Sequence, residues 1–257
     1  NVNCSKGRLI LQYLNLPEKD IFKKIASYIG KIDVLQTCAE LIDKNYCLVD
    51  EIKSDKPIIL MKNFSSPLYD IKNNIVLKNK NLIVTGPNAG GKTTLMKSIL
   101  SNVILAQTLG ISRCDKMVYT RFDKILTNIV KKGENDMSLF QTEIENLGEI
   151  IENCKNARCL VAIDEICSST NSKDGSLIAY NIAKKLGECN STTIITTHLD
   201  SLKKLESNEK TYINYHMKIK RNHGNVEYTY KLYKGYSDET TVFDNINKLP
   251  IDIKKTK

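Results

Sequence analysis

Two periods of hydrophobic and polar positions run along this chain, and each predicts a different kind of element. Between Pro17 and Asn45, apolar residues recur at every third or fourth position among lysines and glutamates. This spacing predicts a helix, which Gly30 could break. The simplest interpretation is a helix that faces the protein core and has no chemical role. The region near Glu51 is a soft boundary between a helical part, 1–50, and a main domain, 51–257.

Beyond this boundary, short apolar runs alternate with longer amphipathic segments. The apolar runs are typical of buried strands and cover residues 57–61, 82–84, 125–130, 159–163 and 193–196. The amphipathic segments predict helices over 93–109 and 138–154, and a third helix that contains 182–186. Strands that alternate with helices indicate an α/β fold with a largely parallel sheet flanked by helices. From Tyr212 to Tyr233 the alternation around the turn 222–225 predicts a C-terminal β-hairpin.

The strand at 82–84 leads into a glycine-rich turn that matches a phosphate-binding motif. Residues 86–93, GPNAGGKT, meet every fixed position of the P-loop pattern G-x-x-x-x-G-K-[ST]. A chance glycine-rich turn is the alternative, but the strand before it and the helix after it are the context that a P-loop requires. The predicted nucleotide-binding residues are Gly86, Pro87, Asn88, Ala89, Gly90, Gly91, Lys92, Thr93 and Thr94.

The chemistry of phosphate binding explains these residue types. Glycines allow successive backbone N–H groups to turn inward around a phosphate, and the following helix adds the positive end of its dipole. Lys92 can reach the terminal phosphates, where it acts as a catalytic cation, and the Thr93 hydroxyl can bind the Mg²⁺ that bridges them. We therefore expect a site for ATP and Mg²⁺.

Two acidic residues and a histidine follow buried strands at the edge where open α/β sheets bind ligands. Asp164 and Glu165 come directly after the run LVAI, so Asp164 could hold Mg²⁺ and Glu165 could polarise the attacking water. Two adjacent acids could instead cap the next helix, but the P-loop upstream favours catalysis. His198 follows the strand at 193–196 and could sense the terminal phosphate or steady the water, although a solitary histidine is more often structural.

Composition restricts the class of protein further. The 257 residues are 41% hydrophobic and 26% charged, and no apolar run approaches the roughly 20 residues that cross a bilayer, so we expect no membrane partner. The eight cysteines are scattered without a C-x-x-C pair, which fits reduced thiols in an intracellular protein of the nucleus, the cytoplasm or a virus-associated compartment. A net charge of +9 suggests an anionic partner such as DNA, or a compositional bias towards lysine. Because the first residue is Asn, we expect a piece of a longer chain.

Taken together, these segments resemble the ATPase domain of the MutS family of DNA mismatch-repair proteins. The resemblance extends backwards, where 32–52 is similar to the end of the family's helical lever and 65–70 to the segment before its nucleotide site. An LSGGQ-like signature, typical of other ABC-type ATPases, does not occur in the sequence. In chain order, the resembling motifs are TGPNAGGKTTLMKSI at 85–99, Ala106-Gln107, SLF at 138–140, LVAIDEICSSTNSKDG at 160–175 and TTH at 196–198.

The resemblance implies a P-loop NTPase of the ABC-ATPase type that hydrolyses ATP with Mg²⁺. Asp164 and Glu165 resemble the family's magnesium and catalytic acids, and His198 resembles its switch histidine. Ser138 resembles the signature serine that reaches in trans to the triphosphate bound by the other subunit, and 169–174 resembles the interfacial loop. The implied partners are a second MutS-like subunit, in a homodimer or heterodimer, and double-stranded DNA with mismatches bound by other regions of a longer chain.

The sequence also departs from the family pattern. Ala89 and Thr93 replace a methionine and a serine, Leu139 and Gln141 replace a threonine and a methionine, and CSSTNSKDG at 167–175 replaces a GRGTSTFDG-like string. Beyond Gly235 the sequence diverges from the family's glycine-containing stretch and helix-turn-helix.

We expect an ATPase domain that couples nucleotide state to a DNA clamp and to mismatched-DNA binding. The alternatives are a MutS relative for branched or recombining DNA and a nucleotide-gated DNA-binding module with weak hydrolysis.

Overall fold

The computed structural model describes residues 12, 19–129, 136–167, 172–222 and 225–237. The chain divides into two compact units, 1–45 and 46–257. The first unit contains helix α2 (Lys19–Ile42), which continues through Gly30 without a break. Apolar side chains of its stripe are half exposed or more, as at Ile25, Ile29 and Leu35. The stripe is helical as predicted, but within this unit it does not face a core.

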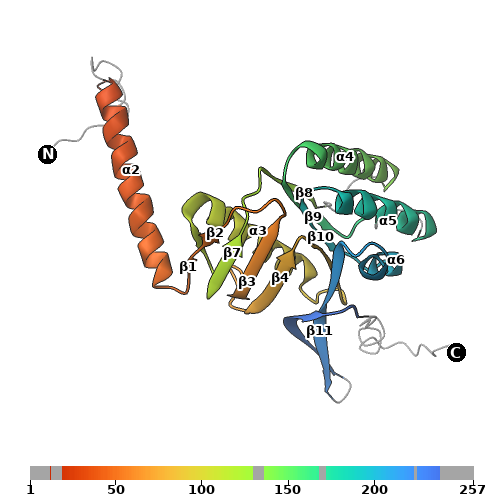
Figure 1. Cartoon of the computed structure of the whole chain (residues 1–257). Helices are drawn as coiled ribbons and strands as arrows, with labels where there is room; N and C mark the ends of the chain where they lie inside the picture. The colour runs from red at the N-terminus through yellow and green to blue at the C-terminus, as the bar shows by residue number, and fades with distance from the viewer. Residues whose placement is uncertain (1–11, 13–18, 130–135, 168–171, 223–224, 238–257) are drawn as a thin grey trace. The chain divides into compact units, whose positions relative to one another are not determined.

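The second unit is built on a six-stranded sheet with the strand order β12–β11–β5–β10–β9–β8 (Figure 1). Its neighbouring strands run parallel from β11 to β8, and β12 pairs antiparallel with β11 as a hairpin. This arrangement confirms the predicted mixed α/β fold with a largely parallel sheet. The strands are β5 (Asn81–Thr85), β8 (Lys124–Ile129), β9 (Cys159–Asp164), β10 (Thr192–Thr196), β11 (Tyr212–Asn222) and β12 (Asn225–Lys234).

Helices cover both faces of this sheet, so its central strands are apolar on both sides. Helix α3 (Lys92–Leu109) packs on one face, while α4 (Asp136–Asn156) and α5 (Ser172–Glu188) lie together on the other (Figure 1). Along β5, Leu82 and Val84 point into the first core and Ile83 into the second. The short helices α6 (Asp200–Lys203) and α7 (Leu205–Asn208) contribute Leu202 and Leu205 to the second core. Within the described residues, no helix is long and apolar enough to span a bilayer.

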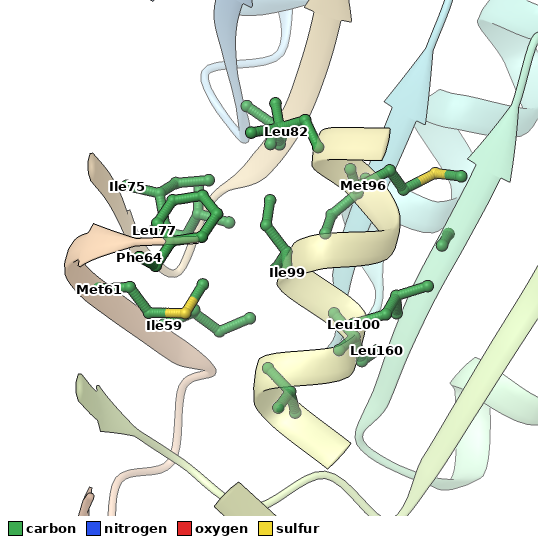
Figure 2. Packing of buried hydrophobic residues seen from close by; sticks show 14 of the residues in the cluster. Ile59, Met61, Phe64, Ile75, Leu77, Leu82, Met96, Ile99, Leu100 and Leu160 are labelled. Atoms are coloured by element: carbon green, nitrogen blue, oxygen red, sulfur yellow. The ribbon is translucent and has the colours of Figure 1, made fainter. Parts of the chain in front are cut away.

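A second sheet, which the sequence pattern indicated only in part, lies on the other side of α3. Its strand order is β2–β7–β3–β4, and β3 pairs antiparallel with both of its neighbours. Figure 2 shows Ile99 of α3 on the side of the helix that faces Phe64 and Leu77 of this sheet, while Met96 points to the opposite side. The strands are β2 (Asp50–Glu51), β3 (Ile58–Phe64), β4 (Asn73–Lys78) and β7 (Lys116–Tyr119), and a separate short pair joins β1 (Cys47–Leu48) to β6 (Ile111–Ser112).

A buried amide fixes α3 against the loop that leads to the candidate site. The side chain of Asn102 is fully buried, and its Nδ2 donates hydrogen bonds of 2.9 Å to the carbonyl oxygens of Ser65 and Ser98. Its Oδ1 accepts from the Ser112 hydroxyl at 2.9 Å and from the Arg113 backbone N–H at 2.8 Å. Because the donor and acceptor groups of this amide are all engaged, the loop at Ser65 has a defined position relative to α3.

Candidate active site

The turn between β5 and α3 has the backbone geometry that makes a P-loop compact. Gly86, Ala89 and Gly91 adopt positive φ values of 134°, 62° and 94°. A Cβ atom at Gly91 would also lie 2.9 Å from Cδ1 of Tyr230, so this position excludes a side chain by space as well as by conformation. Gly90 lies outside the positive-φ region, and a Cβ atom there would lie 2.9 Å from the Pro87 carbonyl oxygen. The reason for glycine at position 90 is therefore space rather than backbone freedom.

Lys92, the first residue of α3, is buried inside this turn. Its Nζ donates to the carbonyl oxygens of Gly86 at 3.1 Å and Pro87 at 3.2 Å, and lies 2.9 Å from Nε2 of His198. Burial lowers the pKa of Lys92, although the nearby Glu165 and Asp164 carboxylates raise it. In this arrangement the ammonium group is hydrogen-bonded to loop carbonyls and an imidazole. A bound phosphate could replace these groups as its hydrogen-bond partner.

Thr93 and Asp164 lie in contact across the site. The Thr93 hydroxyl donates to Oδ2 of Asp164 at 2.9 Å and to Oδ1 at 3.0 Å. Mg²⁺ prefers oxygen ligands, and in nucleotide sites it is held by one or two protein oxygens together with phosphates and water. A hydroxyl and a carboxylate at hydrogen-bond distance, beside a phosphate-binding turn, fit that requirement. These two residues could therefore hold the metal ion.

Glu165 and His198 stand next to this pair. Glu165 has a positive φ of 51°, and its Oε1 lies 3.8 Å from Nε2 of His198. Burial and the charge of Lys92 lower the pKa of His198, while Glu165 raises it. The ordinary pKa of histidine is already below 7, and the net shift lowers it further. The His198 imidazole is therefore neutral near pH 7, and His198 and Glu165 do not form an ion pair there. A neutral Nε2 can accept a hydrogen bond from the Lys92 ammonium group.

A cavity of about 510 Å³ opens beside these residues. Its volume falls in the range of roughly 300 to 1,000 Å³ that is usual for small-molecule sites. The P-loop residues from Asn88 to Thr94 and Glu165 line one part of it. The lining also includes apolar and aromatic side chains that the sequence pattern did not reveal: Phe64, Tyr69, Ile71, Met217 and Tyr230.

Tyr230 reaches the cavity because of an irregularity in the C-terminal hairpin. Lys218 pairs with Lys231 and the next residue, Ile219, pairs with Tyr228, so Tyr230 lies in a β-bulge. It has a positive φ of 54°, and its carbonyl oxygen accepts a hydrogen bond of 3.2 Å from the Asn73 amide. The alternation in the sequence predicts the hairpin, but a bulge of this kind has no marker in residue spacing.

The structure brings the predicted site residues of the single chain to one edge of the sheet. Lys92 and Thr93 begin α3, Asp164 ends β9 with Glu165 directly after it, and His198 follows β10. Ser138 belongs to the first turn of α4, but its side chain lies outside the described residues, as do residues 169–171 of the expected interfacial loop 169–174. The predictions about these two segments are therefore not tested by the structure.

Comparison with known proteins places this site in a family. The model of MutS domain V matches residues 82–249, well over half of the chain. The chain belongs to the MutS family. The similar proteins include the DNA mismatch repair protein MutS of Fusobacterium nucleatum, 29% identical over 86% of this chain and 26% of that protein. The DNA mismatch repair protein MSH3 of Debaryomyces hansenii is 32% identical over 84% of this chain and 23% of that protein.

The MutS-family resemblance of the sequence motifs is thereby confirmed. The DNA mismatch repair protein MutS of Clostridium novyi is also similar, with 28% identity over 90% of this chain and 27% of that protein. The chain thus spans about a quarter of the length of the curated relatives that it matches.

One departure from the MutS-family string, at position 167, lies within the described part of the chain. Cys167 takes the place of the first glycine in the GRGTSTFDG-like string, yet its backbone has a positive φ of 52°. Its N–H donates a hydrogen bond of 2.8 Å to the carboxylate of the buried Glu143 on α4. The backbone conformation that a glycine would adopt without strain is therefore present here with a side chain, and α4 helps to hold it.

Proposed function

We propose that this chain is the ATP-binding and ATP-hydrolysing domain of a MutS-like DNA mismatch repair protein. The observation that carries the proposal is the convergence of Lys92, Thr93 and Glu165 on one cavity beside a P-loop, with Asp164 hydrogen-bonded to Thr93. The similar proteins named DNA mismatch repair protein MutS and MSH3 support the wider role. A module that only binds nucleotide has no need for Glu165 and His198, so their presence favours hydrolysis.

Each residue then has a distinct task. The backbone N–H groups of residues 86 and 88–91 and the ammonium group of Lys92 would bind the phosphates, after Lys92 leaves its contacts with the loop carbonyls and His198. The nucleotide base would lie in the apolar part of the cavity, against Tyr230 and Tyr69. Mg²⁺, held by Thr93 and Asp164, would neutralise charge on the phosphates.

Hydrolysis would proceed by in-line attack of water on the terminal phosphorus. The Glu165 carboxylate would orient this water and accept its proton, and ADP would leave with the electron pair of the broken P–O bond. His198, neutral near pH 7, would contact the terminal phosphate or the water from the other side of Glu165.

Magnesium-dependent release of phosphate from ATP by the 257-residue chain tests this function. We expect release in the presence of Mg²⁺ and none when EDTA removes it, because both the charge neutralisation and the positioning of the phosphates are lost. Absence of binding to a fluorescent ATP analogue would contradict the nucleotide site as a whole. Binding without any release, at high protein concentration, would contradict hydrolysis alone.

The proposal extends to a dimer in which Ser138 of one subunit completes the site of the other. A Ser138→Ala subunit and a Lys92→Ala subunit should each be inactive alone. Mixed, they form heterodimers with one site that combines an intact Lys92 and an intact Ser138, so we expect partial recovery of phosphate release. The assay needs a protein concentration at which dimers form.

A matched control replaces the Lys92→Ala subunit by a Lys92→Ala/Ser138→Ala double variant, since no dimer in that mixture contains a complete site. If heterodimers form and activity does not recover, Ser138 does not act in trans. A serine that only caps α4 would instead cost about 1 kcal/mol of stability on replacement by alanine, with little change in kcat.

The remaining roles concern the longer protein. Residues 1–50 would form the end of a helical lever that carries the nucleotide state to a DNA clamp and to mismatched DNA. The second subunit would be an identical chain or another MutS-like protein. The net charge of +9 is compatible with a DNA partner.

A further inference from the structure

We propose that Thr196 is a positioning residue, which fixes both active-site acids through a single hydroxyl group. This inference rests on the proposed ATPase function. Thr196 is the last residue of β10 and is fully buried. In the sequence, Thr196 ends an apolar strand and begins the TTH motif, but neither pattern assigns it a chemical role.

The two hydrogen bonds of this hydroxyl have fixed directions. Oγ1 of Thr196 donates to Oδ1 of Asp164 at 2.5 Å and accepts from the backbone N–H of Glu165 at 3.0 Å. An ionised carboxylate can only accept and a backbone N–H can only donate, so the one hydroxyl proton must point to Asp164. The same oxygen atom therefore links the side chain of the metal-binding acid to the main chain of the catalytic acid.

The link lies where the strand ladder between β9 and β10 ends. The register between these strands ends with the pair Ile195 and Ile163, one residue before Thr196 and Asp164. Directly beyond it, Glu165 adopts a positive φ of 51°, which side chains rarely adopt and which persists only when neighbouring groups determine it. The Glu165 N–H donates to the Thr196 carbonyl oxygen at 3.1 Å as well as to the hydroxyl. Thr196 thus fixes the backbone of Glu165 through two acceptors, its own carbonyl oxygen and its own hydroxyl oxygen.

Thr196 differs from the other donor to Asp164 in where it is anchored. Among the described residues, Thr93 is the second side-chain donor to this carboxylate, but it belongs to the phosphate-binding turn and has to contact the metal and nucleotide. Thr196 lies in the middle of the sheet, on an element that does not need to rearrange when nucleotide binds. A ligand oriented by a group on a rigid strand keeps its direction in every state of the site.

Burial alone does not explain the pairing of the Thr196 hydroxyl. Thr192 and Thr193 of the same strand are also fully buried, and their hydroxyls have no hydrogen-bond partner among the described residues. The strand therefore accommodates unpaired hydroxyls, whereas the hydroxyl of Thr196 uses both its donor and its acceptor capacity on the two acids. Thr193 also provides a control of the same residue type in the same strand.

The test compares Thr196→Val with Thr193→Val in the 257-residue chain. Valine keeps the shape of threonine and removes the hydroxyl, so we expect Thr196→Val to lower kcat and to raise the Mg²⁺ concentration for half-maximal activity, each by about 10- to 100-fold. Binding of a fluorescent ATP analogue should be unchanged in EDTA and weaker than that of the parent chain in Mg²⁺. The Thr193→Val variant should match the parent chain in every measurement.

Two further variants separate positioning from packing, even if Thr196→Val does not fold. Thr196→Ser keeps the hydroxyl and loses the methyl group, and should retain kcat and Mg²⁺ dependence close to the parent values. Thr196→Ala removes both groups, and should show the lowered kcat and the raised Mg²⁺ requirement that are expected of Thr196→Val. Equal impairment of the serine and alanine variants, or a valine variant with parental kcat and Mg²⁺ dependence, would overturn the inference. A parent chain that neither binds nor hydrolyses ATP would be a different result, because it contradicts the ATPase function itself.

Discussion

Replacement of Glu165 by glutamine is expected to leave ATP bound and to lower kcat by about a hundredfold or more. Glutamine keeps the length and shape of the side chain but cannot take a proton from the attacking water. The backbone of residue 165 should be unaffected, because its N–H bonds to Thr196 do not involve the side chain. Single-turnover phosphate release measures the chemical step, and titration with a fluorescent ATP analogue measures binding.

A control for this experiment is Glu188→Gln, the same chemical change at the last residue of α5. Helix α5 runs from the carboxyl edge of β9 back to the start of β10, so Glu188 lies at the edge of the sheet away from the active site. This variant should hydrolyse ATP at the parental rate. If Glu165→Gln did so as well, the general base would have to be another group.

Replacement of Lys92 by alanine is expected to weaken ATP binding by about a hundredfold, which is the upper end of the range for hydrogen bonds to charged groups. The phosphates lose the buried cation of the loop. In addition, the carbonyl oxygens of Gly86 and Pro87 lose the donor that they have in the structure. The affinity is measured by equilibrium titration with a fluorescent ATP analogue.

Lys97→Ala is the matched control for this variant, because Lys97 is an exposed lysine of the same helix. It tests whether loss of one positive charge from α3 is sufficient to weaken binding. Thermal unfolding of both variants shows whether the folded state persists. Unchanged affinity in a folded Lys92→Ala variant would mean that the loop does not bind phosphate as proposed.

The polar half of the site could be predicted because its residues follow strands that the apolar runs reveal. Asp164 comes after LVAI and His198 comes two residues after the strand that ends at Thr196, so the carboxyl ends of parallel strands bring them to one edge. Lys92 and Thr93 were found through a motif with fixed spacing. These inferences use local sequence together with the regular geometry of an α/β sheet.

The rest of the site depends on contacts that local sequence does not encode. Tyr230 reaches the cavity through a bulge, and β4 contributes Asn73 from a strand whose polar beginning, Asn73-Asn74, resembles a turn. Thr196 belongs to an apolar strand and to the TTH motif, but neither indicates its role, because that role depends on the end of the ladder with β9. The exposed stripe of α2 shows the same limit, since periodicity identifies an apolar face but not what covers it.

The amide of Asn73 has a consequence for how the site comes into existence during folding. It donates to the carbonyl oxygen of Tyr230 and accepts from the backbone N–H of Leu232. These two residues follow Asn73 in sequence by 157 and 159 positions. Contacts of such separation form only after a large loss of chain entropy, whereas the turn between β5 and α3 is local. In a newly made chain, the phosphate-binding turn would therefore form before the part of the cavity that contains Tyr230. A nucleotide that binds the complete cavity more tightly than the partial one would favour the last step of folding by mass action.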